Sequence, residues 1–501
     1  MDIEKALPRL PDPLHPRDSA RNHHPPRDSL STDCSFNTLV NDSSRPSRVQ
    51  KEPLSSPTSA PCTSEQDVFP QRKRYLTVFG AFLALFCTFG QMNSFGTFQT
   101  WYSIHQLNDL PSSTISWIGS LQLWVFFFSG SAIGYFFDMH GPTALMTCGT
   151  VCFVLSTVFT SISTHYYQYI LSQGILFGVG VGLLFYPPLA SVSRSFVNYR
   201  ATALGIAAGG SSLGGVVYPI MLRGLFDRVG FGWTMRINAL MSLVLSVAAT
   251  LMVSSPKTSS GSNDERKEET GRSSFSKYLI IFGINDSRFL LLIFGSSLVA
   301  LGLFIPIFYL SSFAHDILGI SSSTSFLVIA TLNAGGVVGR VAPAIISDRL
   351  GHFNILVPSA FLSGLFVLTA WFVPASEAEE LFAQLQTHHD STSTSVHSSL
   401  AAVLVFAVLY GVCSGAFISL INPCIVKVTK DVNVVGRRIG FFYTVISFPS
   451  LVGGPIAGSL LNSEHGSYHG MILFSGITLI IGSLFLFIAR LFVDNRIWAR
   501  V

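Results

Sequence analysis

Long apolar stretches dominate the chain from Arg74 to its C-terminal end. Runs of apolar residues, each about as long as a membrane helix, recur twelve times between short polar or glycine-containing segments. A helix needs about 20 apolar residues to cross a bilayer, whereas a barrel strand needs only about ten residues of alternating polarity. The pattern therefore predicts twelve membrane-spanning helices, at 75–98, 114–137, 143–163, 167–192, 200–223, 233–253, 288–313, 324–347, 353–374, 399–425, 437–461 and 469–492.

Two polar segments interrupt this pattern. Residues 1–70 contain 11 of the 24 prolines with many Ser, Arg and Asp residues, which is typical of a disordered tail. A second polar segment separates the sixth apolar run from the seventh. We therefore expect a disordered cytosolic tail over 1–74, a six-helix half over 75–253, a cytosolic linker over 254–287, a second six-helix half over 288–492 and a short cytosolic tail over 493–501.

Composition supports a membrane protein and excludes several other classes. Of the 501 residues, 49% are hydrophobic and only 12% are charged, and the mean hydropathy of +0.49 is too high for a soluble chain of this length. The basic residues are scattered rather than massed, so we expect no nucleic-acid partner. No cluster of His, Cys or acidic residues lies at membrane depth, so we expect neither an enzyme nor a bound metal or cofactor. The expected partners are the lipid bilayer and a small solute.

Lys and Arg residues predict the orientation of the helices. They gather at one set of helix ends, which includes Arg74, Arg194, Arg200 and Arg349, and the opposite loops hold few of them. Loops rich in Lys and Arg face the cytosol. We therefore expect both termini in the cytosol and a plasma-membrane location, with a vacuolar or other endomembrane location as the alternative.

One arginine lies well inside an apolar run. Arg340 precedes Asp348 at the end of its run by eight residues, which is about 12 Å along a helix. A cation at that depth costs about 2.5 to 3.5 kcal/mol or more, so it normally faces a cavity and marks a functional site. Snorkelling, or hydrogen bonds to nearby carbonyls, would make it purely structural. Asn333, seven residues earlier, lies on the same helix face and favours function.

Few other polar groups lie within the apolar runs. An apolar and aromatic cavity with a few polar anchors suits an organic ligand of moderate size. The residues that we expect to line such a cavity with Arg340 and Asn333 are Asn93, Gln99, Tyr186, Tyr309, Asn422, Phe442 and Tyr443. Each aromatic among them could instead pack in the core or face lipid.

The two halves of the chain resemble each other. A shift of 210 residues superposes Asp138 on Asp348 and Gly141 on Gly351, each after an apolar run. Double glycines also stand in the fifth and eleventh runs, and glycine-rich stretches end in proline in the fourth and tenth. Several matches in the same order indicate an internal repeat of six helices.

The segments around Asp138 and Asp348 resemble the loop motif of the major facilitator superfamily, G-x3-D-(R/K)-x-G-(R/K). Gly134, Asp138 and Gly141 match in the first half, although Met139 and Pro142 replace basic residues, and Asp348, Arg349 and Gly351 match in the second. The resemblance implies two six-helix halves that move against each other, with these residues in gating roles. Capping of a turn explains them nearly as well. The gating residues that we assign are Asp138, Gly141, Asp348, Arg349, Gly351 and Arg200.

Within that superfamily the chain is most similar to the monocarboxylate porters of fungi. The stretch SFVNYRATALGIAAGG resembles their signature F-x-K-R-R-x-L-A-x-G-x-A-x-A-G at Phe196, Arg200, Gly205 and Gly209, and the first and eleventh runs resemble theirs as well. The resemblance implies a carboxylate-bearing substrate. It also implies an aspartate one turn before the arginine of the eighth span, where this chain has Gly336.

The sequence thus predicts a secondary transporter that moves an organic anion or a carboxylate-bearing metabolite. An efflux carrier for a secondary metabolite and a non-transporting nutrient sensor with the same fold are the alternatives. Because the spans hold no acidic residue or histidine clear of their ends, we expect weak coupling to protons.

Overall fold

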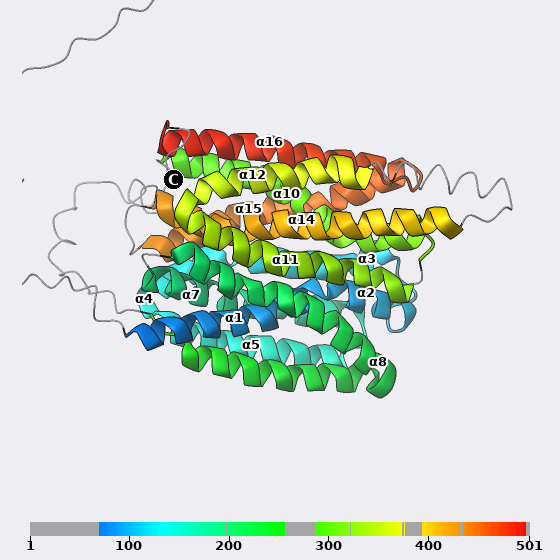
Figure 1. Cartoon of the computed structure of the whole chain (residues 1–501). Coiled ribbons are helices and arrows are strands. Elements are labelled where there is room, and N and C mark those ends of the chain that lie inside the picture. The colour runs from blue at the N-terminus through cyan, green and yellow to red at the C-terminus, as the bar shows by residue number, and fades with distance from the viewer. Residues whose placement is uncertain are drawn as a thin grey trace, which may run out of the picture. The chain divides into compact units, whose positions relative to one another are not determined.

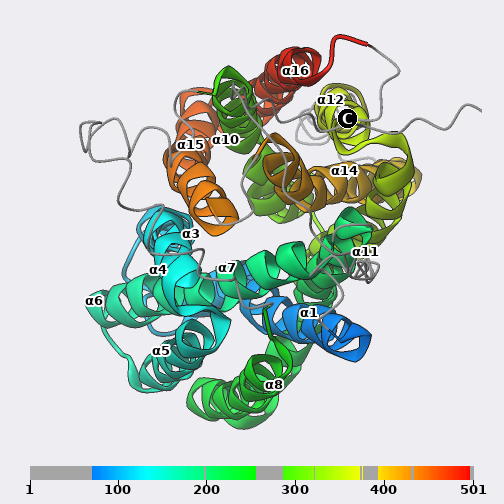
Figure 2. The ribbon, with the colours of Figure 1, turned by 90° about the vertical axis from the view of Figure 1, so that its left-hand side faces the viewer.

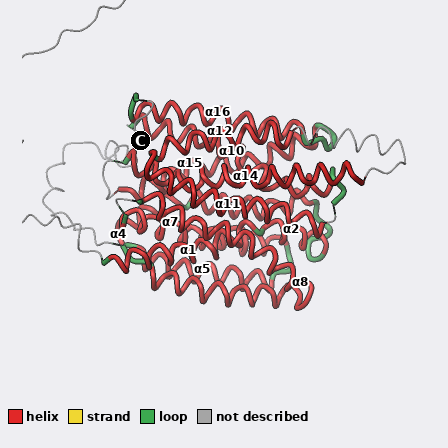
Figure 3. The backbone as a smooth tube through the Cα atoms, viewed as in Figure 1, coloured by secondary structure: helices red, strands yellow, loops and turns green. Residues whose placement is uncertain are grey.

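The computed structural model describes residues 70–196, 199–255, 286–320, 322–372, 375, 393–429 and 434–496. The chain divides into two units, Met1–Thr63 and Ser64–Val501, and all the described residues belong to the second. All regular structure in these residues is helical, and none of them forms a strand (Figure 3). The predicted N-terminal tail and the linker lie almost entirely outside the described residues.

The helices follow the apolar runs closely. The first half holds α1 (Gln71–Asn93), α2 (Phe95–Ile104), α3 (Ser112–Phe128), α4 (Gly130–His140), α5 (Pro142–Ile162), α6 (Tyr166–Tyr169), η2 (Ile170–Leu176), α7 (Phe177–Ser195) and α8 (Arg200–Met252). The second half holds α10 (Ser287–Asp316), α11 (Ser322–Leu350), α12 (His352–Phe366), η3 (Val367–Trp371), α14 (Ser393–Val428), α15 (Val435–Ser463) and α16 (His469–Val493).

Twelve crossings are present, as the apolar pattern predicts. In the described part of the chain, 11 helices are long and apolar enough to span a membrane. One of them, α8, has 53 residues, about twice what a bilayer requires. Gly230 interrupts it with a φ of 75°, and Figure 1 shows the chain turning back there. The predicted spans 200–223 and 233–253 are therefore the two arms of α8, and the predicted fold class is confirmed.

Several crossings are less regular than the pattern predicts. The first bends at Ser94 and the second at Ser129, which separate α1 from α2 and α3 from α4. In both places the serine hydroxyl bonds back to a carbonyl of the preceding turn: Ser94 to Gly90 at 2.8 Å and Ser129 to Phe126 at 2.9 Å. Such bonds compete with the helical ladder and bend helices. The two π-helical segments, η2 and η3, were not predicted either.

The twelve crossings form two groups. In Figure 2, which looks along the helices, α1 to α8 gather on one side and α10 to α16 on the other. The groups meet where α11 packs against α8 and where α15 packs against α3 and α4. We call the end of the bundle where α1 begins and α16 ends the terminal end, which lies on the left in Figure 1.

Candidate functional site between the two halves

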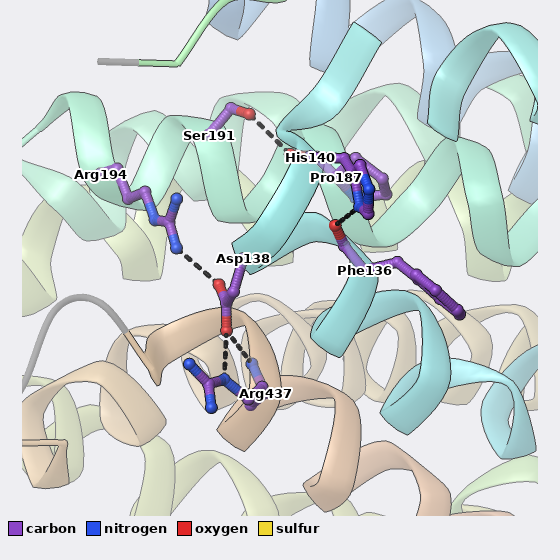
Figure 4. A network of polar contacts seen from close by, with 7 residues as sticks. All are labelled: Phe136, Asp138, His140, Pro187, Ser191, Arg194 and Arg437. Carbon is purple, nitrogen blue, oxygen red and sulfur yellow. Dashed lines mark hydrogen bonds and ion pairs between the residues drawn. The ribbon is translucent and has the colours of Figure 1, made fainter. Parts of the chain in front are cut away.

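Asp138 joins the halves at the terminal end. It is the antepenultimate residue of α4, and its carboxylate is only 2% exposed. One oxygen accepts from Arg194 of α7 at 2.5 Å. The other accepts from the main-chain N–H of Arg437 at 3.0 Å and from its side-chain Nε at 3.2 Å (Figure 4). Asp138 therefore neutralises a cation of its own half and binds the first turn of α15 in the other half.

Asp348 makes the corresponding contact on the other side of the interface. It lies near the end of α11 and accepts from the N–H groups of Ala201 at 3.1 Å and Thr202 at 2.8 Å. The Thr202 hydroxyl donates a third bond at 2.6 Å. These N–H groups belong to the first turn of α8, where no helical acceptor exists for them. Each half thus supplies one aspartate that caps a helix of the opposite half.

Glycines bring the paired helices together beside these aspartates. A Cβ on Gly134 of α4 would collide with the carbonyl oxygen of Gly436 in α15. One turn further in, a Cβ on Gly440 would collide with the carbonyl oxygen of Gly130. On the other side, Gly205 of α8 has no room for a Cβ against Arg340 and Ala344 of α11. Small residues permit such close helix approach in membranes, so the terminal end is closed by packing as well as by charge.

Arg340 and Asn333 both face α8 across the interface. Arg340 is 6% exposed, and one terminal nitrogen donates to the carbonyl of Ala208 and to the hydroxyl of Ser211. Among the described residues, its Nε has no hydrogen-bond partner. Asn333 is 5% exposed and lies against Gly215 of the same α8 arm. Arg340 therefore donates to a carbonyl, as expected if its role were purely structural. That carbonyl, however, belongs to the opposite half.

Four of the other predicted residues come together near the middle of the interface. The Tyr443 hydroxyl donates to Asn422 at 3.3 Å, and the ring of Tyr443 lies 5.5 Å from that of Tyr186. The Tyr186 hydroxyl donates to the carbonyl of Phe126 at 3.3 Å. Phe442 is fully buried beside Tyr443. This group joins α7 of the first half to α14 and α15 of the second.

The remaining predicted residues lie elsewhere. Tyr309 donates to the carbonyl of Gly454 at 3.1 Å, a contact between α10 and α15 inside the second half. Asn93 and Gln99 are half-buried on either side of the bend at Ser94. Gly141 and Gly351, with φ of 76° and 102°, form the tight turns after α4 and α11. Arg200 donates to the carbonyl of Phe196 at 2.9 Å, and Arg349 is exposed.

Several residues at the interface were not among the predicted site residues. Arg194 and Arg437 appeared in the sequence only as charges at helix ends, yet both bind Asp138. Thr202 and Ser211 gave no signal, and neither did Phe127, whose ring lies 5.5 Å from that of Tyr443. Their partners are distant in the chain. Within the described residues, no group of three or more His, Cys, Asp or Glu side chains could hold a metal ion.

Comparison with known proteins agrees with this architecture. The model of the Major Facilitator Superfamily matches residues 81–385. The chain belongs to that superfamily. It is 36% identical over 427 residues to the MFS-type transporter pynF of Aspergillus niger. The aligned region covers 85% of this chain and 90% of that relative. It is 38% identical over 416 residues to the agnestins efflux protein AgnL12 of Paecilomyces divaricatus, with 83% and 87% covered.

A third relative is the MFS transporter asaE of Aspergillus flavus, 35% identical over 417 residues, with 83% of this chain and 86% of the relative covered. The superfamily consists of transporters for small molecules, so this chain is an integral, multi-pass membrane protein with a small-molecule substrate. Both residues that bind across the interface at the terminal end, Asp138 and Asp348, lie inside the matched range.

In such a transporter the two halves enclose a site and open it to one side at a time. The cross-half contacts of Asp138, Asp348 and the glycines lie at the terminal end, and those of Arg340 and Tyr443 lie deeper. The structure therefore holds the terminal end closed. The two capping interactions and the contacts of Arg340 all join the two halves in this arrangement.

Proposed function

We propose that this transporter exports an organic metabolite that carries a carboxylate or another anionic group. The observation that carries the proposal is the environment of Arg340. Its guanidinium is buried at the interface of the halves. Within the described part of the chain its partners are a main-chain carbonyl and a serine hydroxyl rather than a carboxylate. A buried cation without a counter-ion is costly, and an anionic substrate would supply that counter-ion.

Two further features support this proposal. The monocarboxylate-porter resemblance of the first, fifth and eleventh spans favours a carboxylate as the anionic group. The direction of transport is suggested by a relative with 38% identity, which is named as an efflux protein. Simple proton-lactate symport is disfavoured, because Gly336 stands where the resemblance implies a proton-carrying aspartate, one turn before Arg340.

The test compares the medium of cells that lack the protein with that of cells that express it. We expect at least one anionic metabolite to disappear from the medium in the deletion strain and to return with the wild-type chain. Arg340→Ala should not restore secretion, and Arg340→Lys should restore it only in part, because a lysine cannot form the bidentate contact with a carboxylate.

Arg236→Ala is the matched control, since it removes an exposed arginine of α8 whose guanidinium lies 5.0 Å from the centre of the Trp233 ring. It should preserve secretion. Full secretion by Arg340→Ala, at equal protein level, would show that the arginine is only a structural tie between α11 and α8. Identical media with and without the protein would reject export altogether and favour a sensor.

We also propose that the terminal end faces the cytosol, in the plasma membrane. The proposal rests on the Lys and Arg residues at that end of the helices. The sequon Asn285-Asp286-Ser287 ends on the first residue of α10, so on this orientation it should carry no glycan. A glycosidase-sensitive mass shift that is lost in Asn285→Gln would reverse the orientation.

A further inference from the structure

Seven aromatic side chains gather where the two halves meet. We call them the cross-half aromatic cluster, and its members are Phe89, Phe126, Phe127, Phe185 and Tyr186 of the first half and Phe304 and Tyr443 of the second. Phe127 lies at the middle of the span Thr114–His140. The cluster therefore lies near the middle of the membrane, where superfamily transporters enclose their substrates.

Tyr443 is the point at which the second half enters this cluster. Its ring is parallel to that of Phe127, with 5.5 Å between the centroids and 3° between the planes. It also lies 5.5 Å from the ring of Tyr186 and 5.9 Å from that of Phe185. Three rings of one half thus surround a single ring of the other, and the parallel pair joins α3 to α15.

A second aromatic cluster shows what ordinary core packing looks like in this protein. Phe98, Tyr102, Tyr169, Phe226 and Phe231 contact one another at centroid distances of 4.5 to 6.4 Å, and all belong to the first half. These rings stay together when the halves move as units. In contrast, the contact between Phe127 and Tyr443 is lost whenever α3 and α15 separate.

Polar atoms border the cross-half aromatic cluster on one side. The hydroxyls of Tyr443 and Tyr186 each donate a bond of 3.3 Å, to Asn422 and to the carbonyl of Phe126. Hydroxyl hydrogen bonds in proteins are typically about 2.7 to 2.8 Å long. These two long bonds are readily exchanged for bonds to an oxygen of a ligand. None of the seven members of the cluster is a charged residue.

We propose that the substrate is a planar, conjugated ring compound that is held between Phe127 and Tyr443 when the halves part. This inference rests on the proposed export function and names the shape of its substrate. Separation of the parallel rings exposes two flat faces at membrane depth. A flat aromatic ligand restores stacking on both faces, whereas a puckered, saturated ring of the same carbon skeleton cannot do so.

The test compares 2-naphthoate with decahydro-2-naphthoate, which has the same carbon skeleton but saturated and therefore puckered rings. Both carry one carboxylate, so the contribution of Arg340 cancels in the ratio of their affinities. We expect the purified full-length protein to bind 2-naphthoate about tenfold more tightly, as stacking on two ring faces implies. Phe127→Leu and Tyr443→Leu should each lower the ratio to about threefold, because each variant leaves only one of the two ring faces in place.

Phe226→Leu is the matched control, because it truncates a ring of the within-half cluster. It should leave the ratio unchanged. Absence of saturable 2-naphthoate binding, equal affinities for the two probes, or an unchanged ratio in Phe127→Leu and Tyr443→Leu would overturn the proposal. Secretion by cells is measured separately from binding. If cells secrete the metabolite but the protein shows no preference for the planar probe, only the aromatic site is rejected. If the protein prefers the planar probe but cells secrete nothing, only export is rejected.

Discussion

Asp138 and Asp348 show what the sequence reveals about single residues and what it does not. Their equivalence follows from the 210-residue repeat, and their position at helix ends follows from the apolar pattern. Their partners could not be predicted, because Asp138 binds a residue 299 positions later and Asp348 one 146 positions earlier. α4 pairs with α15, and α11 with α8, only when the two halves have assembled, so neither pairing is visible in the local sequence.

Gly336 leads to a prediction about proton coupling. It lies one turn before Arg340, and a Cβ there would stand 2.7 Å from the hydroxyl of Ser212 in α8. An aspartate at this position, as the porter resemblance implies, would therefore have to displace the Ser212 hydroxyl. We expect collapse of the transmembrane pH gradient by an ionophore to change export by less than about twofold, since the spans lack a relay group.

The measurement is the initial rate of metabolite export from cells or vesicles with and without the ionophore. Gly336→Ala provides a steric control, because it crowds Ser212 without adding a carboxylate. Complete loss of accumulation against a concentration gradient would contradict the prediction and would indicate a proton carried by the substrate itself or by an interface aspartate.

The helices could be predicted where an apolar run was long and uninterrupted. Bends and turns within a run could not be predicted. The twelve crossings could be predicted from the sequence, with ends within several residues of those observed, because bilayer thickness sets helix length. The bends at Ser94 and Ser129 depend on single hydroxyl-to-carbonyl bonds, which apolar periodicity does not reveal. The merging of two crossings into α8 reflects a helical connection that turns at one glycine, Gly230.

Close packing of α4 on α15 gives a prediction at this scale. Gly134→Ala places a methyl group against the carbonyl of Gly436 and should hinder closure of the terminal end. Overpacking of this kind costs about 1 to 3 kcal/mol, which lowers the ratio of closed to open protein by about fivefold or more. Export should fall accordingly, as measured by secretion at matched protein levels.

Gly224→Ala is the matched control, since no atom lies within 4 Å of a Cβ at that position of α8. It should export at the wild-type rate. If Gly134→Ala also exported normally, the contact between α4 and α15 would not limit the transport cycle.

At the scale of the whole molecule, the two halves hold each other through reciprocal contacts. Each contributes an aspartate to the first turn of a helix in the other, and glycines beside both aspartates let the backbones meet. The sequence repeat predicts this symmetry in outline, but not that both contacts form in the same conformation. We infer that the terminal end opens when both are released.

The distance between the halves at the terminal end tests this account most directly. Met139 at the end of α4 and Leu350 at the end of α11 are 60% and 53% exposed, so both accept spin labels after replacement of the seven native cysteines. Pulsed electron paramagnetic resonance should show one short distance in the parent protein and an added longer one when Asp138→Asn and Asp348→Asn are combined. An unchanged distance distribution in a folded double variant would contradict opening at this end.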